Sequence, residues 1–370
     1  MRFLVLSFMV LTLTLVTDDY PPPPPVPGGS AETPTLHHTT TTISTTTTTT
    51  TTRKPKMPRK QTRSQSMTNQ KNRVKMIPTR EHCLLRPDVY IGGVQPLTEK
   101  IWVYENKEMV HKQITHSPGF FKIFDEILVN AVDNRQNNEA ENSLFCNTIR
   151  VTFDKKENEI KVYNNGKGMR IRKTTNLEGE EMYEPTMAFG EMLSSSNYDD
   201  DIQRTGGGRN GIGAKACNVF LKKFTVETAC FEDNANFFQR WEQNMKKRHD
   251  AVVRDFDHQN PFDGQDGTEV SFQPDLERFY MEKLDDNNIA LLSRRVVDVA
   301  ATVQGITVFL DDTPIEANNF RKYVELFVKG QDFVYEHFGE QTGERWEIAV
   351  APSSDGYQQI SFVNRVLLTG

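Results

Sequence analysis

Cysteine is scarce in this sequence, and its few cysteines are not arranged as a covalent framework. The 370 residues include four cysteines, which are scattered and form no C-x-x-C pair. This distribution argues against a disulfide-stapled fold and against a cysteine-based zinc site, and a reducing compartment fits it best. The chain also lacks any N-x-S/T sequence for N-glycosylation, which gives no support to export.

Acidic residues are absent from a basic arm, residues 53–75, which carries nine Lys and Arg side chains. Because the whole chain has a net charge of −6 and the arm contributes +9, the remainder carries −15. A basic arm binds nucleic acid or serves as a nuclear address, but a solvated tail has the same composition. With 36% hydrophobic residues, the chain can form one large domain or two ordinary ones.

The N-terminal segment, residues 1–17, contains one Arg, a long apolar run and no acidic residue. It has the pattern of a secretory signal and is somewhat short for a membrane span. The Pro and Thr tracts that follow, up to residue 52, bury too little apolar surface to fold and resemble a spacer. Three interpretations of this head remain: export, an organellar presequence, or a segment that does not belong to the working protein.

Folded structure is expected from about Arg80 onward. Ser117-Pro118-Gly119 predicts a helix start, because proline is favoured in the first turn. Alternation of apolar and polar residues predicts strands, and 3.6-residue periodicity predicts helices. The expected strands are 101–104, 148–153, 159–163, 224–228, 268–272, 306–310, 346–350 and 358–363, and the later expected helices are 288–301 and 320–328.

The helix that starts near Pro118 has two distinct faces. Its apolar stripe, which predicts packing against a core, consists of Phe120, Ile123, Phe124, Ile127, Leu128 and Ala131. Beside it, Glu126, Asn130, Asp133 and Asn134 form one polar stripe. A solvated face is the ordinary explanation of such a stripe. Asn and Asp are poor helix formers, however, so their clustering suggests a polar function.

A glycine-rich stretch, residues 204–220, has the sequence RTGGGRNGIGAKACNVF. Its glycines permit backbone angles closed to other residues, and residues 214–217 predict the first turn of a helix. A loop leading into a helix start favours an anion such as a polyphosphate, to which Arg209 and Lys215 would add mobile positive charge. The preceding polar residues do not form the buried strand of a dinucleotide fold, and Gly213 is not followed by the Lys and Ser or Thr of a P-loop. A flexible hairpin tip is the alternative.

Six motifs follow one another along the sequence: LLRPDVYIGGV, KIFDEILVNAVDN, NNGKGM, LSSSNYDDD, TGGGRNGIGAK and QQISFVN. Their order resembles that of GHKL ATPases, the fold shared by type II DNA topoisomerases, heat-shock chaperones, MutL proteins and histidine kinases. Together they resemble most closely the N-terminal ATPase region of a eukaryotic type II topoisomerase. The chaperone and MutL branches are less similar, because NNGKG and SSSNYDDD resemble the topoisomerase branch and not these two.

The resemblance implies an α/β (α+β) fold, the GHKL or Bergerat two-layer sandwich with a mixed sheet. It places the ATPase domain at residues 80–329 and a truncated transducer domain at 330–370. These would follow the apolar segment 1–17 and a disordered Pro/Thr-rich and then basic linker, residues 18–79. The resemblance also implies ATP and Mg²⁺ as cofactors.

Several residues match functional positions of the family. Glu126 matches the general base, which deprotonates the water that attacks the γ-phosphate. Asn130 matches the side-chain ligand of Mg²⁺, a hard ion that prefers oxygen ligands. Asn164 stands where most of the superfamily has an Asp that accepts from the adenine amino group, and this Asn marks the eukaryotic topoisomerase branch. Gly168 lets its turn approach the base, and Thr268 matches a threonine that lines the adenine pocket.

Further matches concern the sugar, the phosphates and the lid over them. Ser195, Ser196 and Asn197 match ribose and phosphate contacts. The expected nucleotide contacts also include Asn134 and the lid residues Gly208, Arg209, Asn210, Gly211, Ile212, Gly213, Ala214 and Lys215. Because the lid makes its contacts mainly through the backbone, we expect Gly211 and Gly213 to tolerate substitution least.

The sequence also departs from the family pattern. Asn137 stands where relatives commonly have a basic residue, Ile212 replaces an aromatic residue, and the N-terminal strap has no counterpart near Val74. The transducer's lysine loop, the Toprim domain and the DNA-cleaving tyrosine are not found. ATP binding is therefore a stronger expectation than hydrolysis, and strand passage by this chain alone is not expected.

The function implied is that of the ATP-binding gate of a type II DNA topoisomerase, which uses ATP hydrolysis to drive DNA strand passage. Expected partners are double-stranded DNA, through the complete enzyme, and a second subunit, either an identical copy or a full-length topoisomerase. No membrane partner is expected. Rival interpretations are a non-catalytic nucleotide-binding paralogue and a sequence that is incorrect at both ends. The function predicts the nucleus, with the mitochondrion as alternative.

Overall fold

The computed structural model describes residues 8–15, 74–139, 146–192, 194, 212–257, 260–338, 345–363 and 366–368. Two units are distinguished by their internal contacts. One consists of Met1–Asp19 together with Pro78–Gly370, and the other of Tyr20–Ile77. All helices and strands described below belong to the first unit.

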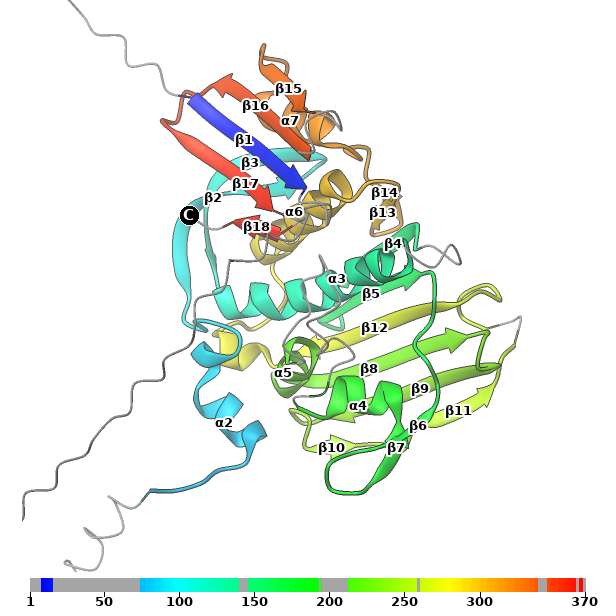
Figure 1. Ribbon diagram of the computed structural model, residues 1–370. Helices are drawn as coiled ribbons and strands as arrows, with labels where there is room; N and C mark the ends of the chain where they lie inside the picture. The colour runs from blue at the N-terminus through cyan, green and yellow to red at the C-terminus, as the bar shows by residue number, and fades with distance from the viewer. Residues whose placement is uncertain are drawn as a thin grey trace, which may run out of the picture. The chain divides into compact units, whose positions relative to one another are not determined.

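The main sheet of the described chain has nine strands (Figure 1). Their order is β10-β9-β8-β12-β5-β4-β13-β14, and β11 also pairs with β9. Since β13 runs parallel to β4 and the other pairs are antiparallel, the sheet is mixed, as predicted. The strands are β4 (Thr148–Asp154), β5 (Glu159–Asn165), β8 (Leu221–Cys230), β9 (Ala235–Glu242), β10 (Lys247–Arg248), β11 (Val252–Asp255), β12 (Gly267–Pro274), β13 (Thr307–Leu310) and β14 (Thr313–Pro314).

One face of this sheet is covered by helices and the other is more exposed (Figure 1). On β5, Ile160 and Val162 are buried whereas Lys161 between them is exposed, which is the alternation of a one-sided sheet. This arrangement confirms the predicted two-layer sandwich. The helices are α2 (Thr79–Leu85), α3 (Pro118–Glu139), α4 (Glu184–Gly190), α5 (Gly213–Val219), α6 (Asp286–Thr302) and α7 (Phe320–Val328), with 3-10 turns at Pro87–Val89 and Leu276–Phe279.

Helix α3 forms where the sequence predicts it. It begins at Pro118, and the Ser117 hydroxyl accepts from the Phe120 N–H at 3.4 Å, which satisfies one free donor of the first turn. Its predicted apolar stripe is buried throughout: Phe120, Ile123, Phe124, Ile127, Leu128 and Ala131 are each no more than 5% exposed. The burial of this stripe fixes the direction in which the neighbouring polar stripe points.

A buried polar network joins α3 to two later helices. Arg295 of α6, only 3% exposed, donates from Nε to Asp125 Oδ1 of α3 at 2.7 Å. Asp298 of α6 accepts from the Tyr323 hydroxyl of α7, also at 2.7 Å. Because removing one partner would leave a buried group unpaired, this network resists displacement of α3.

The remaining strands form two small hairpins and a second, five-stranded sheet. The hairpins are β2 (Leu97–Glu105) with β3 (Glu108–His116), and β6 (Lys173–Thr175) with β7 (Glu181–Tyr183). The second sheet has the order β15-β16-β1-β17-β18, with β15 (Val334–Phe338), β16 (Arg345–Pro352), β1 (Phe8–Leu15), β17 (Gln358–Val363) and β18 (Val366–Leu368). The sequence predicted β16 and β17 but not β1, which lies within the apolar N-terminal segment.

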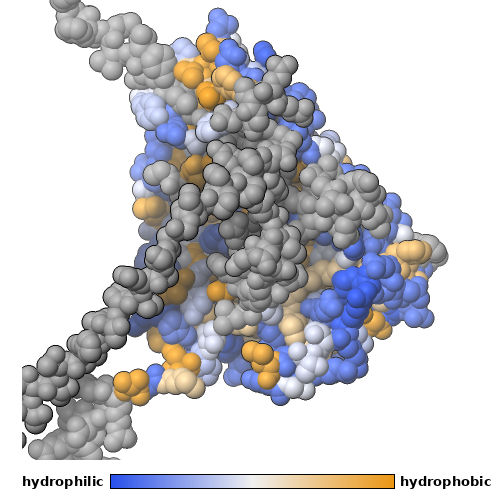
Figure 2. All heavy atoms as spheres, in the orientation of Figure 1, coloured by the Kyte–Doolittle hydropathy of each residue, from blue (hydrophilic) through white to orange (hydrophobic). Residues whose placement is uncertain are grey.

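The surface seen in Figure 2 is mostly hydrophilic, and its apolar side chains form separate small groups. Exposed large hydrophobic residues are accordingly spread over several elements, including Leu97, Phe231, Val334 and Tyr357. Within the described ranges, no helix is both long enough and apolar enough to cross a membrane.

Candidate functional site

The Glu126 carboxylate lies against the first residue of α5. Glu126 Oε1 is 2.6 Å from Lys122 Nζ. A Cβ atom added to Gly213 would stand 3.0 Å from Glu126 Cδ and closer still to Oε2, nearer than real Cβ atoms come to a neighbour. Glycine is therefore needed at position 213 for a steric reason. The predicted base and the predicted lid glycine are brought together here.

The pKa of the Lys122 ammonium group depends on the carboxylate of Glu126 beside it. Burial is the largest single influence and lowers the pKa of Lys122, but the charges of Glu126 and Asp125 and the hydrogen bond to Glu126 together raise it above the ordinary value. Lys122 therefore remains charged and holds the carboxylate in an ion pair within one turn of α3.

The polar stripe of α3 continues from Glu126 to a turn at the end of β5. Asn130 is exposed, and Asn134 Nδ2 donates to the carbonyl oxygen of Lys167 at 2.9 Å. Gly166 in this turn has φ +98°, and a Cβ there would stand 3.0 Å from Asn134 Oδ1. The stripe thus spans about 12 Å along the helix, from α5 to the turn.

Three polar side chains form one row across adjacent strands of the main sheet. Asn164 of β5 pairs in register with Thr268 of β12, which pairs with Thr228 of β8. All three are buried, and the hydroxyls of Thr228 and Thr268 are 2.8 Å apart. The Met169 N–H donates to Thr228 Oγ1 at 3.1 Å, so the row also holds the turn that follows β5. Asn164 and Thr268, the two predicted adenine contacts, therefore lie side by side.

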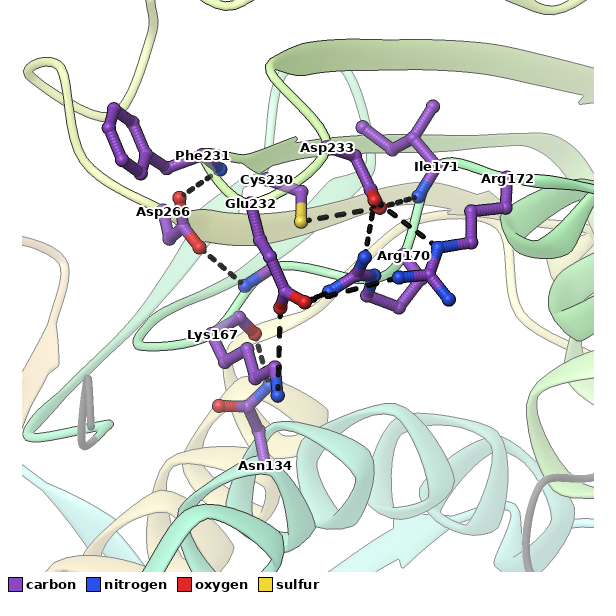
Figure 3. A network of polar contacts seen from close by, with 11 residues as sticks. Asn134, Lys167, Arg170, Ile171, Arg172, Cys230, Phe231, Glu232, Asp233 and Asp266 are labelled. Carbon is purple, nitrogen blue, oxygen red and sulfur yellow. Dashed lines mark hydrogen bonds and ion pairs between the residues drawn. The ribbon is translucent and has the colours of Figure 1, made fainter. Parts of the chain in front are cut away.

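Two aspartates outside the predicted set clamp this turn (Figure 3). Asp266 accepts from the Gly168 N–H at 3.4 Å and from the Phe231 N–H at 2.6 Å. Asp233 accepts from the Ile171 N–H at 2.7 Å and forms ion pairs with the side chains of Arg170 and Arg172. Asp233, in the turn between β8 and β9, and Asp266, directly before β12, thereby hold the backbone at Ile171 and Gly168. Asp266 belongs to the segment DGTEVSFQPD that contains Thr268, whereas no sequence pattern marks Asp233.

Lys215 differs from its predicted role as a mobile charge. Its side chain is buried in α5 and donates from Nζ to the carbonyl oxygen of Ser194. Burial lowers the pKa of Lys215 to about 8. The sequence could not show this, because the burial depends on where the chain before the lid passes over α5.

The rest of the predicted set is only partly described. Ile212 precedes α5 and Ala214 lies buried within it. Seven predicted residues lie outside the described part of the chain: Ser195, Ser196, Asn197, Gly208, Arg209, Asn210 and Gly211.

The donor chemistry at the stripe fits Mg²⁺ bound together with a nucleotide. The described residues contain no group of three or more His, Cys, Asp or Glu side chains that could hold a metal ion. Mg²⁺ usually takes one or two protein oxygens and completes its shell with phosphates and waters. The exposed amide of Asn130, between Glu126 and Asn134 on the same helix, offers one such oxygen.

Residues 115–278 match the family model of histidine kinase-, DNA gyrase B- and HSP90-like ATPases. The fold is therefore that of a GHKL-type ATPase domain. In sequence, the chain is 40% identical to the ATPase region of Saccharomyces cerevisiae topoisomerase II. Comparison with the crystal structure of that region gives a TM-score of 0.72 and covers 80% of this chain and 75% of that one. The ATPase and transducer domains of DNA topoisomerase II from Balamuthia mandrillaris give 40% identity and a TM-score of 0.71, over 80% of this chain and 72% of that one.

Among curated proteins, DNA topoisomerase 2 of Drosophila melanogaster is 45% identical over 292 residues, which make up 77% of this chain and 19% of that protein. The chain belongs to the eukaryotic type II topoisomerase family and corresponds to its N-terminal ATPase region. It spans about a fifth of the length of the curated relatives that it matches.

Proposed function

We propose that this chain binds ATP together with Mg²⁺ and hydrolyses it, acting as the nucleotide gate of a type II DNA topoisomerase. The observation that carries the proposal is the polar stripe of α3. It begins with Glu126 beside the lid helix α5 and ends with Asn134 at the turn next to Asn164 and Thr268. The stripe thus joins the expected phosphate end of the site to the expected adenine end.

Two residues of the stripe, and two residues on the strands near its far end, have roles that their surroundings allow. Glu126 accepts the proton of the water that attacks the γ-phosphate, and Lys122 keeps its carboxylate oriented. Asn130 supplies an oxygen to Mg²⁺, which when bound neutralises phosphate charge. Asn164 and Thr268 recognise the adenine edge. The polar row and the aspartate clamp hold that edge of the site in place.

The proposal extends to the larger enzyme. The relatives are named as DNA topoisomerases, and the sequence of residues 53–75 carries positive charge that suits phosphate backbones. We therefore propose double-stranded DNA as the substrate of the complete enzyme, reached through a dimer of this chain or through pairing with a full-length topoisomerase. For such a function we propose the nucleus as the compartment, with the mitochondrion as the alternative.

The test is Mg²⁺-dependent ATP binding and turnover by the full chain. Glu126→Gln should keep nucleotide affinity within a few fold and lose turnover by at least about 100-fold, because it removes only the base. Asn130→Ala should weaken binding in Mg²⁺ and leave binding in EDTA unchanged. Glu325→Gln, an exposed substitution on α7, is the matched control and should change neither quantity.

The possible results separate the candidate functions. Turnover that depends on Glu126 supports the proposed gate. Binding without turnover in any variant would support the rival interpretation, a non-catalytic nucleotide-binding partner of a full-length topoisomerase. Absence of any ATP·Mg²⁺ binding by the full chain would refute both.

A further inference from the structure

Asp125 stands directly before Glu126 on α3, has no role in the proposed chemistry, and is held by two cations. Its side chain is 16% exposed. Arg295 Nε of α6 is 2.7 Å from Asp125 Oδ1, and Lys122 Nζ of α3 is 3.8 Å from Oδ2. One carboxylate oxygen is thus paired with a neighbouring helix, and the other faces the preceding turn of its own helix.

Lys122 is shared between two adjacent carboxylates. It precedes Asp125 by three residues and Glu126 by four, and both spacings bring side chains together on a helix. Its Nζ lies 2.6 Å from Glu126 Oε1 but 3.8 Å from Asp125 Oδ2. The competition between these two carboxylates therefore decides which of them the ammonium group holds.

The guanidinium group of Arg295 settles this competition in favour of Glu126. Arg295 is 3% exposed, so little water screens its charge from Asp125. Burial is the largest influence on the pKa of Arg295 and lowers it, but the charges of Asp125 and Asp298 and the hydrogen bond to Asp125 raise it overall. Arg295 therefore stays charged and satisfies Asp125. Lys122 is then left to pair with Glu126.

Helix α6 is anchored on both sides of Arg295, so that its charge is offered at a fixed position. Asp298, one turn further along α6, accepts from the Tyr323 hydroxyl of α7 at 2.7 Å. Arg294 Nη1 donates to the carbonyl oxygen of Trp102 in β2 at 3.3 Å. Because these contacts hold the helix from α7 and from the β2–β3 hairpin, Arg295 does not depend on α3 for its place.

The carboxylate of Glu126 is positioned from two sides. Lys122 holds Oε1, and Oε2 lies against Gly213 at the start of α5. A shift of Lys122 toward Asp125 would release Oε1 and let the carboxylate turn. Displacements of about 1 Å can lower a catalysed rate on the order of 100-fold.

We propose that Arg295 is a positioning residue for Glu126. By pairing with Asp125, it leaves Lys122 to hold the carboxylate of the base. The inference rests on the proposed function, in which Glu126 is the base. It adds a residue from another helix that acts through Asp125 and Lys122 and not on the nucleotide itself.

The first test removes the charge of Arg295 in the full chain. In Arg295→Met, Lys122 is the cation left beside Asp125 in the described part of the chain, and we expect it to move there. Turnover should fall by at least about 10-fold, while affinity for ATP·Mg²⁺ stays within about 3-fold of the wild type. Arg295→Lys keeps the charge and should recover most of this loss. Arg254→Met, at an exposed arginine on β11, is the matched control and should change neither quantity.

Two double variants distinguish positioning from a general loss of stability. Adding Asp125→Asn to Arg295→Met removes the competing carboxylate and should raise turnover by at least about 5-fold over Arg295→Met alone. In a Lys122→Met background, Arg295→Met should lower turnover by less than about 2-fold further, because Arg295 acts through Lys122. Additive losses in this background, or no recovery with Asp125→Asn, would overturn the proposal. Arg295→Gln replaces Arg295→Met in each comparison if the latter does not fold.

The position of Lys122 is a measurement that needs no turnover. In crystal structures, Lys122 Nζ should lie nearer to Asp125 in Arg295→Met and nearer to Glu126 when Asp125→Asn is added. An ammonium group that stays on Glu126 in Arg295→Met would contradict the inference. Absence of turnover in the wild type would refute the proposed function instead, and the position of Lys122 would still decide whether Arg295 controls it.

Discussion

A single methyl group at position 213 should disable catalysis while leaving the fold intact. An ideal Cβ on Gly213 lies 3.0 Å from Glu126 Cδ and closer to Oε2, whereas ordinary carbon contacts are about 3.5–4.0 Å. The carboxylate of Gly213→Ala must therefore retreat by about 1 Å. Displacements of this size can lower a rate on the order of 100-fold.

The fold should tolerate the same substitution. The obstructing atoms are the end of a flexible side chain, and alanine is the better helix former by about 0.5–1 kcal/mol. We therefore expect Gly213→Ala to melt within a few degrees of the wild type, to bind ATP·Mg²⁺ and to lose at least about 100-fold in turnover. Gly93→Ala is the control, since nothing lies within 4 Å of its added Cβ. Turnover of Gly213→Ala equal to that of Gly93→Ala would refute the reasoning.

Three further predictions concern the surroundings of the site. Gly168→Ala should destabilise the protein by more than about 2 kcal/mol in thermal or urea unfolding, because its Cβ would stand 2.7 Å from the carbonyl carbon of Ala229 and neither backbone can yield easily. Asp233→Asn should lower stability by about 1–3 kcal/mol and weaken nucleotide binding, since Asp233 holds the turn backbone and two arginines. An unchanged nucleotide affinity would show that this aspartate contributes to the fold and not to nucleotide binding. Burial lowers the folded-state pKa of Lys215 to about 8, so between pH 8 and the unfolded pKa near 10.5 the unfolded chain binds more protons. The stability of wild type relative to Lys215→Met should therefore rise across that window, by at most about 3 kcal/mol, and a flat difference in urea unfolding would contradict this assignment.

The parts of the structure that were predictable are those in which one segment carries its own pattern. Helix α3 was predicted by its six-residue apolar stripe, and β5 by its alternation. The need for glycine at position 213 was also predicted, although from backbone contacts and not from the side chain that lies against it. In each case the information lies within about twenty residues of sequence, where periodicity and turn chemistry are most informative.

The unpredicted parts depend on segments that meet only in the fold. An aspartate in a turn, such as Asp233, is ordinary turn chemistry until a loop with free N–H groups is placed against it. The burial of Lys215 depends on the carbonyl of Ser194. Strand β1 pairs with residues at the opposite end of the chain, and an apolar run at an N-terminus has the pattern of a leader. No local pattern in the sequence reveals any of these three arrangements.

The candidate adenine site illustrates the same limit at the scale of the sheet. Val162, Val270 and Val226 form a buried apolar row across β5, β12 and β8. Two residues along the strands, the next row on the same face consists of Asn164, Thr268 and Thr228. Each of these polar residues alone is ordinary for a strand. The register aligns all three, and it does so close to the turn that the polar stripe of α3 contacts through Asn134. The edge of the hydrophobic core is thus also the edge of the site. The polar side chains are buried there because all three neighbouring strands change from an apolar to a polar residue at the same register position, so that the hydroxyls of Thr228 and Thr268 bond to each other.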